Sequence, residues 1–249
     1  MATATMPQAA RPTVGRRTDN YFFSGMAFLL LLTVFVGFAR TYFLAGAFRA
    51  PLPSVLVHIH GIVFSCWILL LITQVSLVSA RRVDIHRQLG LFGFGLACLM
   101  VVLGVLTASG LLVRGVSPVP VFDAKTFYVI PMSDMVVFAT LILFAYRYRS
   151  NPAAHKRLIL LATIAIMDAP TGRPPFAAIT AHKYFDSIFC LAFLLLLVSY
   201  DLWSTRKVHP ATIWGGLLMI IVEQVRVPIG LSGGWYAFAT WAQNLARSV

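Results

Sequence analysis

Residues 54–90 read SVLVHIHGIVFSCWILLLITQVSLVSARRVDIHRQLG, and this stretch decides the fold. From 54 to 79 it contains no Asp, Glu, Lys or Arg, and it exceeds the roughly 20 residues that an α-helix needs to cross a bilayer. Arg81, Arg82 and Arg87 follow at once, and another apolar run begins directly behind them. Because apolar runs and short basic loops alternate along the whole chain, the sequence predicts an all-α, polytopic membrane protein.

Seven transmembrane helices are expected from this alternation. Their predicted bounds are roughly 21–43, 54–79, 89–113, 127–147, 157–179, 184–203 and 211–230. Residues 1–20 form a polar tail, and the apolar run behind it is longer than the about 7–15 residues of a signal-peptide core, which predicts an uncleaved first span. Residues 231–249 carry several aromatic side chains and are expected to lie as an anchor in the outer membrane interface.

Charge predicts how the bundle is oriented. The 20 Lys and Arg residues give a formal net charge of +12, but only 11% of the chain is charged and 59% is apolar, against about 25% charged residues in a soluble domain. The basic residues lie between apolar runs, which argues against nucleic-acid binding and for a bilayer as the main partner. Twelve fall on the side of the N-terminus and six on the other side. This excess predicts a cytoplasmic N-terminus, and short loops suggest a bacterial inner membrane.

Ionisable residues inside the predicted spans are the strongest indication of a functional site. Charge in hydrocarbon is costly, so such side chains usually face the interior of a bundle. With the N-terminus inside, these residues fall in the middle or outer half of the bilayer: Asp134, Asp168, Arg173, Asp186, Glu223 and Arg226. They indicate either a polar cavity open to the outside or a neutralised lock between helices. Three prolines and a glycine in 168–176 predict a broken helix lining that cavity, or a helix that ends early.

One stripe of the second predicted span is patterned. His60, Trp67 and Gln74 recur every seven residues, which is nearly two helical turns, so they lie along one face. His58 points to nearly the opposite side, so His58 and His60 cannot easily bind one metal ion. The stripe indicates interhelical hydrogen bonding, with a ligand or proton-relay role for His60 as the alternative.

Two predicted helix starts on the N-terminal side resemble each other. One reads Asp84-Ile-His86-Arg87 and the other reads Ala154-His155-Lys156-Arg157. The two histidines are compatible with a pair of haem-iron ligands near the inner face, or the basic residues beside them with groups that hold haem propionates or lipid phosphate. The alternative is that both segments are orientation anchors. Other chemistries lack their motifs, since the chain has no Gly-rich phosphate loop, no His-Glu-x-x-His and no Cys-x-x-Cys.

The run His60-Gly61, Trp67, Gln74, His86-Arg87-x-x-Gly90, followed by His155-Lys156-Arg157 and a Pro-rich segment, resembles a group of uncharacterised bacterial multispan membrane proteins. The His-Arg-x-x-Gly pattern is also weakly similar to cytochrome-b561-like bundles, which implies paired histidine ligands to haem b. This chain departs from the two-haem arrangement, because only His58 and His60 lie within predicted spans. One haem is compatible with the sequence, held by His60 and His182 on the outer side or by His86 and His155 on the inner side.

Three functions are therefore compatible with the sequence. The first is a redox protein linked to haem or quinone, resting on the histidines at both faces. The second is a transporter of protons or small solutes, resting on the charges of the outer half. The third is a structural or assembly subunit of a membrane complex, either with a protein partner or as a homo-oligomer.

Overall fold

The computed structural model describes residues 15–51, 53–173 and 185–248. These residues form helices and no strand. Among the described residues, six helical segments are long and apolar enough to cross a membrane: Arg17–Phe43, Val55–Ser79, Val83–Arg114, Ala124–Arg147, Ile188–Thr205 and Pro210–Gly230. The chain therefore has the composition and architecture of a multi-pass membrane protein, as the sequence predicts.

Most helix bounds lie close to the predicted ones. The first predicted span is divided into α1 (Arg16–Phe38) and a short π-helix, η1 (Ala39–Phe43). The other long helices are α2 (Val55–Ser79), α3 (Val83–Arg114), α4 (Ala124–Arg147), α8 (Phe185–Thr205) and α9 (Pro210–Gly230). Side-chain caps begin several of them: Ser54 accepts from the Val57 backbone N–H, and Asp123 accepts from the Lys125 and Thr126 backbone N–H groups.

The fifth predicted span differs from a plain transmembrane helix. In its place, α5 (Pro152–Ile164) has 13 residues and is followed by a turn and by α6 (Asp168–Thr171). At 1.5 Å per residue, α5 is about 20 Å long, less than the about 30 Å of a hydrocarbon core. Pro170, within α6, has no N–H to donate to the Ile166 carbonyl, which weakens the helical ladder of this segment. The break predicted after Asp168 is thus present and begins earlier, whereas 174–179 lie outside the described residues.

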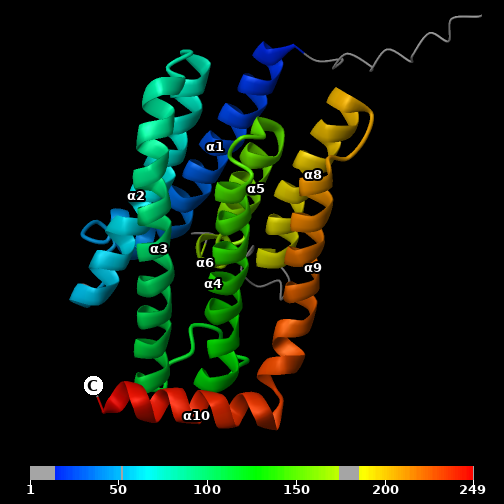
Figure 1. The fold of residues 1–249 in the computed structure, drawn as a ribbon. Coiled ribbons are helices and arrows are strands. Elements are labelled where there is room, and N and C mark those ends of the chain that lie inside the picture. The colour runs from blue at the N-terminus through cyan, green and yellow to red at the C-terminus, as the bar shows by residue number, and fades with distance from the viewer. Residues whose placement is uncertain (1–14, 52, 174–184, 249) are drawn as a thin grey trace, which may run out of the picture.

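The long helices run roughly side by side, and α10 (Gly233–Arg247) lies across one end of them (Figure 1). The start of α1 lies at the opposite end, together with the turns 80–82, 148–151 and 206–209. We call this end the basic end, because many of the chain's arginines and lysines lie there: Arg17, Arg81, Arg82, Arg87, Arg147, Arg149, Lys156, Arg157, Arg206 and Lys207. The first described part of the chain and α10 therefore lie at opposite ends of the bundle.

Helix α4 is the centre of the bundle, since it contacts α3, α5, α9 and α10. Phe138 and Leu141 of α4 pack with Leu161 of α5 in one continuous core, and each is at most 1% exposed. Glycine permits a very close approach of α1 to α6: a Cβ atom on Gly37 would lie 2.2 Å from the backbone oxygen of Pro170. This contact fixes the broken segment against the first span.

The C-terminal segment forms an amphipathic helix, α10. Its buried side is made of Ala239 and Ala242. The indole Nε1 of Trp235 donates to the Lys125 carbonyl at 2.8 Å. Gln243 Nε2 donates to the Leu112 carbonyl at 2.7 Å. The helix thereby covers the ends of α3 and α4, and Phe238, Trp241 and Leu245 remain exposed on its outer side.

Candidate functional site

Two histidines that are far apart in the sequence meet at the basic end. Helix α3 begins right after a turn in which Arg81 has a φ of 62°, and this brings His86 into its first turns. Asn151 caps α5 by accepting from the Ala154 N–H at 3.2 Å, and Pro152 follows at the first helical position. His155 is thereby placed opposite His86, with ring centroids 6.4 Å apart and ring planes at 84°.

The polar atoms of the two histidines and of the neighbouring Gln74 differ in their hydrogen bonding. His155 Nδ1 lies 2.9 Å from the Ala145 carbonyl oxygen. Gln74 of α2 donates from Nε2 to the His86 carbonyl at 3.3 Å, so it supports the backbone at the pair. His86 Nδ1 and Gln74 Oε1 are both buried and have no hydrogen-bond partner. Unpaired buried polar atoms are rare and call for an explanation, which a bound group can supply.

His60 lies near the other end of α2. Its ring stacks on Phe64 with centroids 4.0 Å apart, and its Nδ1 is buried without a hydrogen-bond partner. Its predicted companion His182 lies outside the described residues. Trp67, one step along the same stripe, donates from Nε1 to Thr163 Oγ1 of α5 at 3.2 Å. The stripe of His60, Trp67 and Gln74 thus faces neighbouring parts of the bundle, with Trp67 and Gln74 acting as interhelical donors.

The predicted outer charges assemble around one guanidinium group. Arg226 of α9 is 5% exposed. Its Nη1 lies 3.1 Å from Asp134 Oδ1 of α4 and 2.7 Å from Asp168 Oδ2 of α6. Its Nη2 lies 2.6 Å from Glu223 Oε1, one helical turn earlier on α9. We call these four residues the Arg226 cluster; it ties the broken segment to α4 and α9.

Arg173, another residue of the predicted outer set, makes contacts of a different kind. Arg173 donates from Nη1 to the Ala169 carbonyl at 2.6 Å, and its guanidinium carbon lies 5.4 Å from the ring centroid of Phe38. The side chain of Asp186 lies outside the described part of the structure. Cys190 joins the cluster instead, since its Sγ donates to Asp168 Oδ1 at 3.1 Å.

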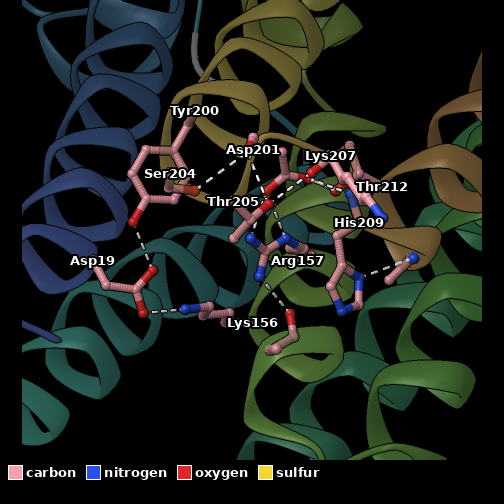
Figure 2. Close-up of polar contacts among 12 residues, drawn as sticks. Asp19, Lys156, Arg157, Tyr200, Asp201, Ser204, Thr205, Lys207, His209 and Thr212 are labelled. Carbon is pink, nitrogen blue, oxygen red and sulfur yellow. Dashed lines mark hydrogen bonds and ion pairs between the residues drawn. The ribbon is translucent and has the colours of Figure 1, made fainter. Parts of the chain in front are cut away.

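A second polar network, which the sequence pattern did not indicate, lies at the basic end (Figure 2). Asp201 of α8 is fully buried and accepts from Arg157 Nε at 2.9 Å and Nη2 at 2.5 Å. It also accepts from the His209 backbone N–H at 3.0 Å and from Thr212 Oγ1 at 2.6 Å. Arg157 is 3% exposed, so this is a completely buried ion pair that joins α5, α8 and α9.

A smaller branch of the network reaches α1. Asp19 accepts from Lys156 Nζ and, at 2.7 Å, from the Tyr200 hydroxyl. Lys156 and Arg157 are therefore occupied by carboxylates, which disfavours the expectation that they hold haem propionates. Beside them, burial and then the positive charge of Arg157 lower the pKa of His209 below its ordinary value. The sequence offers one signal for these pairs, namely that Asp19 and Asp201 are acidic residues near the ends of two spans. It does not show which helices lie side by side, so the partners of these carboxylates could not be predicted.

Within the described residues, no three His, Cys, Asp or Glu side chains are grouped closely enough to hold a metal ion. A pair of histidines can still hold a metal-containing cofactor, provided that the cofactor itself supplies the other ligands of the metal. Comparisons of this chain with models of protein families, with curated proteins and with solved structures found no match.

Proposed function

We propose that this multi-pass membrane protein is an electron carrier that holds one haem b between His86 and His155 at the basic end. The observation that carries the proposal is the approach of these two rings from α3 and α5, with centroids 6.4 Å apart. A metal–nitrogen bond of about 2 Å on each side of one metal ion places two imidazole centroids about 6 Å apart. The separation suits two histidines that would hold a single iron.

The hydrogen bonding of His155 supports the same assignment. A carbonyl oxygen only accepts, so the proton of the neutral ring belongs on Nδ1, facing Ala145, and Nε2 is left with its lone pair. A ligating histidine commonly donates its other ring N–H to a backbone carbonyl in this way. His86 Nδ1, which is buried without a partner, provides a second nitrogen that a metal would satisfy. Gln74 positions the His86 backbone beside them.

Haem held by His86 and His155 would supply one-electron chemistry. The chain's own contribution is to fix the two imidazoles and to limit access by water. Arg87 is exposed next to His86 and is the basic side chain nearest in sequence for a propionate. An electron partner dissolved in the bilayer, such as a quinone, could approach between the spans. The proposal assigns the basic end to the cytoplasmic side of a bacterial inner membrane, and the excess of basic residues at that end supports the orientation.

An optical spectrum tests the proposal. The protein is expressed with added haem precursor, purified in mild detergent and checked for helicity and monodispersity. We expect a Soret band and, after reduction, the sharp α-band of six-coordinate haem. His86→Ala and His155→Ala should each abolish the six-coordinate spectrum, whereas His58→Gln, which changes a histidine outside the pair, should preserve it. A folded wild-type protein without a Soret band rejects the haem, and equal loss in His58→Gln rejects the assigned ligands.

The Arg226 cluster favours ion translocation as a second candidate function. The observation that supports this function is the broken helix formed by α5 and α6. Its second part begins with Asp168, whose carboxylate pairs with the buried Arg226. Discontinuous helices with ionisable groups at mid-membrane are typical of transport sites. Proteoliposomes with an internal pH-sensitive dye measure proton flux directly. Asp168→Asn should remove the flux if the cluster conducts, and the exposed Asp84→Asn should retain it; no flux in the wild type rejects this role.

A further inference from the structure

Two adjoining grooves flank α1 at the basic end. One, with a volume of about 510 Å³, lies between α1 and α8; it is lined by Thr18, Tyr21, Phe22, Leu196, Ser199, Tyr200 and Trp203. The other, of about 550 Å³, lies between α1 and the end of α2; it is lined by Arg17, Asn20, Tyr21, Ser24, Ser76, Ser79 and Ala80. Tyr21 borders both, so the two grooves meet around its exposed ring.

The two grooves differ in chemistry. Aromatic and aliphatic surface dominates the groove between α1 and α8, where Phe22 and Tyr200 stack with ring centroids 3.8 Å apart and Trp203 is 61% exposed. The groove between α1 and α2 is more polar, because three serines, one asparagine and one arginine line it together with Tyr21 and Ala80. The described residues that line it include no acidic side chain. One groove thus suits a hydrocarbon chain, and the other suits a group that accepts hydrogen bonds and carries negative charge.

Positive charge is held at the polar groove. Arg17 Nε donates to the Tyr21 hydroxyl at 3.1 Å, and the guanidinium carbon lies 5.7 Å from the Tyr21 ring centroid. Arg81 and Arg82 follow directly on Ala80 at the groove's edge, and both are exposed. Arg82 Nε lies 3.5 Å from Asp84 Oδ1 in an exposed ion pair. Asp19, the nearest acidic residue along α1, accepts from Lys156 and Tyr200 on the side of α8. With three arginines and one acidic side chain, Asp84, at this edge, the groove between α1 and α2 keeps a net positive rim.

We propose that these grooves together form a binding site for one anionic phospholipid of the leaflet at the basic end. The phosphate and headgroup lie in the groove between α1 and α2, where Arg17 supplies charge and Ser76 and Ser79 supply hydroxyl donors. An acyl chain lies along the apolar groove between α1 and α8. This site is separate from the histidine pair, and it does not depend on any cofactor.

Native mass spectrometry of the full-length protein, released from neutral detergent, tests the site. The probes are phosphatidylglycerol and phosphatidylcholine with identical acyl chains. We expect the wild type to retain phosphatidylglycerol preferentially. Arg17→Gln should lower the phosphatidylglycerol affinity about fivefold, the effect of one basic residue at a membrane surface. Ser79→Ala should lower it about threefold while leaving every charge in place.

Arg147→Gln is the matched control, because Arg147 is an exposed basic residue at the same end but at the close of α4. Its affinity for phosphatidylglycerol should equal that of the wild type. Equal losses in Arg17→Gln and Arg147→Gln would reduce the effect to surface charge and overturn the site. So would a wild type without headgroup preference, or displacement of the lipid by millimolar inorganic phosphate. If Arg17→Gln does not fold, the Ser79→Ala result decides.

A fluorescence experiment tests the place of the acyl chain. Phosphatidylglycerol with brominated acyl chains should quench tryptophan fluorescence more than brominated phosphatidylcholine does. Trp203→Phe should remove that headgroup-dependent excess, because Trp203 lines the apolar groove. Trp241→Phe, on the outer side of α10 at the opposite end, should leave it intact. Persistence of the excess in Trp203→Phe contradicts the assignment of the groove.

Discussion

A single buried carboxylate holds three helices together at the basic end. Asp201 is 0% exposed and receives hydrogen bonds from α5, from α9 and from the residue that precedes α9. Each of its oxygens has at least two donors, so the desolvation of the charge is well compensated. Such a pair matters for stability mainly because removal of one partner leaves an uncompensated charge in the interior.

Asp201→Asn should therefore destabilise the protein strongly. The amide keeps the volume but leaves the Arg157 guanidinium buried without a counter-charge, which costs about 3–5 kcal/mol. Thermal or denaturant unfolding in mild detergent measures the loss. Asp84→Asn is the control, since Asp84 and Arg82 are 65% and 57% exposed at 3.5 Å, and such a pair contributes about 0–1 kcal/mol. The double variant Arg157→Met/Asp201→Leu should recover most of the stability; equal stability of Asp201→Asn and Asp84→Asn would contradict the role of the pair.

The residues also show what sequence reasoning can and cannot reach. Asp134, Asp168, Glu223 and Arg226 are conspicuous as charges inside apolar runs, and the structure brings all four together. Asp201 escapes notice because it lies near the end of its span, where an acidic residue is common. His86 and His155 stand out by their similar helix starts, but their approach depends on the lateral placement of α3 and α5, which local sequence does not encode.

At the scale of elements, α10 depends on small residues. Ala239 is 0% exposed against the ends of α3 and α4, whereas Ala237 on the same helix is exposed. The apolar run that decides a transmembrane span is absent here, and the aromatic residues alone predict an interfacial segment. The contacts of Trp235 and Gln243 with backbone carbonyls explain why the segment lies across the bundle and not along it.

Ala239→Phe should detach α10 from the bundle, because a large ring cannot occupy a fully buried alanine position without moving the helix. Ala237→Phe adds the same ring to the exposed side and should leave α10 in place. Hydrogen exchange of the backbone amides of 233–247 distinguishes the two outcomes. We expect protection to fall throughout α10 in Ala239→Phe, while α3 and α4 stay protected. Similar protection in both variants would show that α10 does not depend on this contact.

At the scale of the whole molecule, helix lengths explain why the count of spans is the weakest part of the sequence prediction. A Pro-rich segment with enough apolar residues satisfies a hydropathy count, yet α5 ends after 13 residues and Pro170 interrupts the ladder beyond it. The directions of the other helices do not depend on that segment. They place the turn at 148–151 and the C-terminal end of α10 at opposite ends of the bundle (Figure 1).

This arrangement predicts which sites a membrane-impermeant thiol reagent can reach. Single cysteines are introduced at Ser150, in the turn between α4 and α5, and at Ser248, after α10, in a chain whose Cys66, Cys98 and Cys190 are replaced by alanine. Ser248→Cys should react in intact cells, because the proposed orientation puts the basic end on the cytoplasmic side. Ser150→Cys should react only after the membrane is permeabilised, and the cysteine-free chain should not react at all. Labelling of both positions from one side would refute the placement of the two ends on opposite sides. If Ser150→Cys reacted in intact cells and Ser248→Cys only after permeabilisation, the cytoplasmic assignment of the basic end would be refuted, while the fold would stay intact.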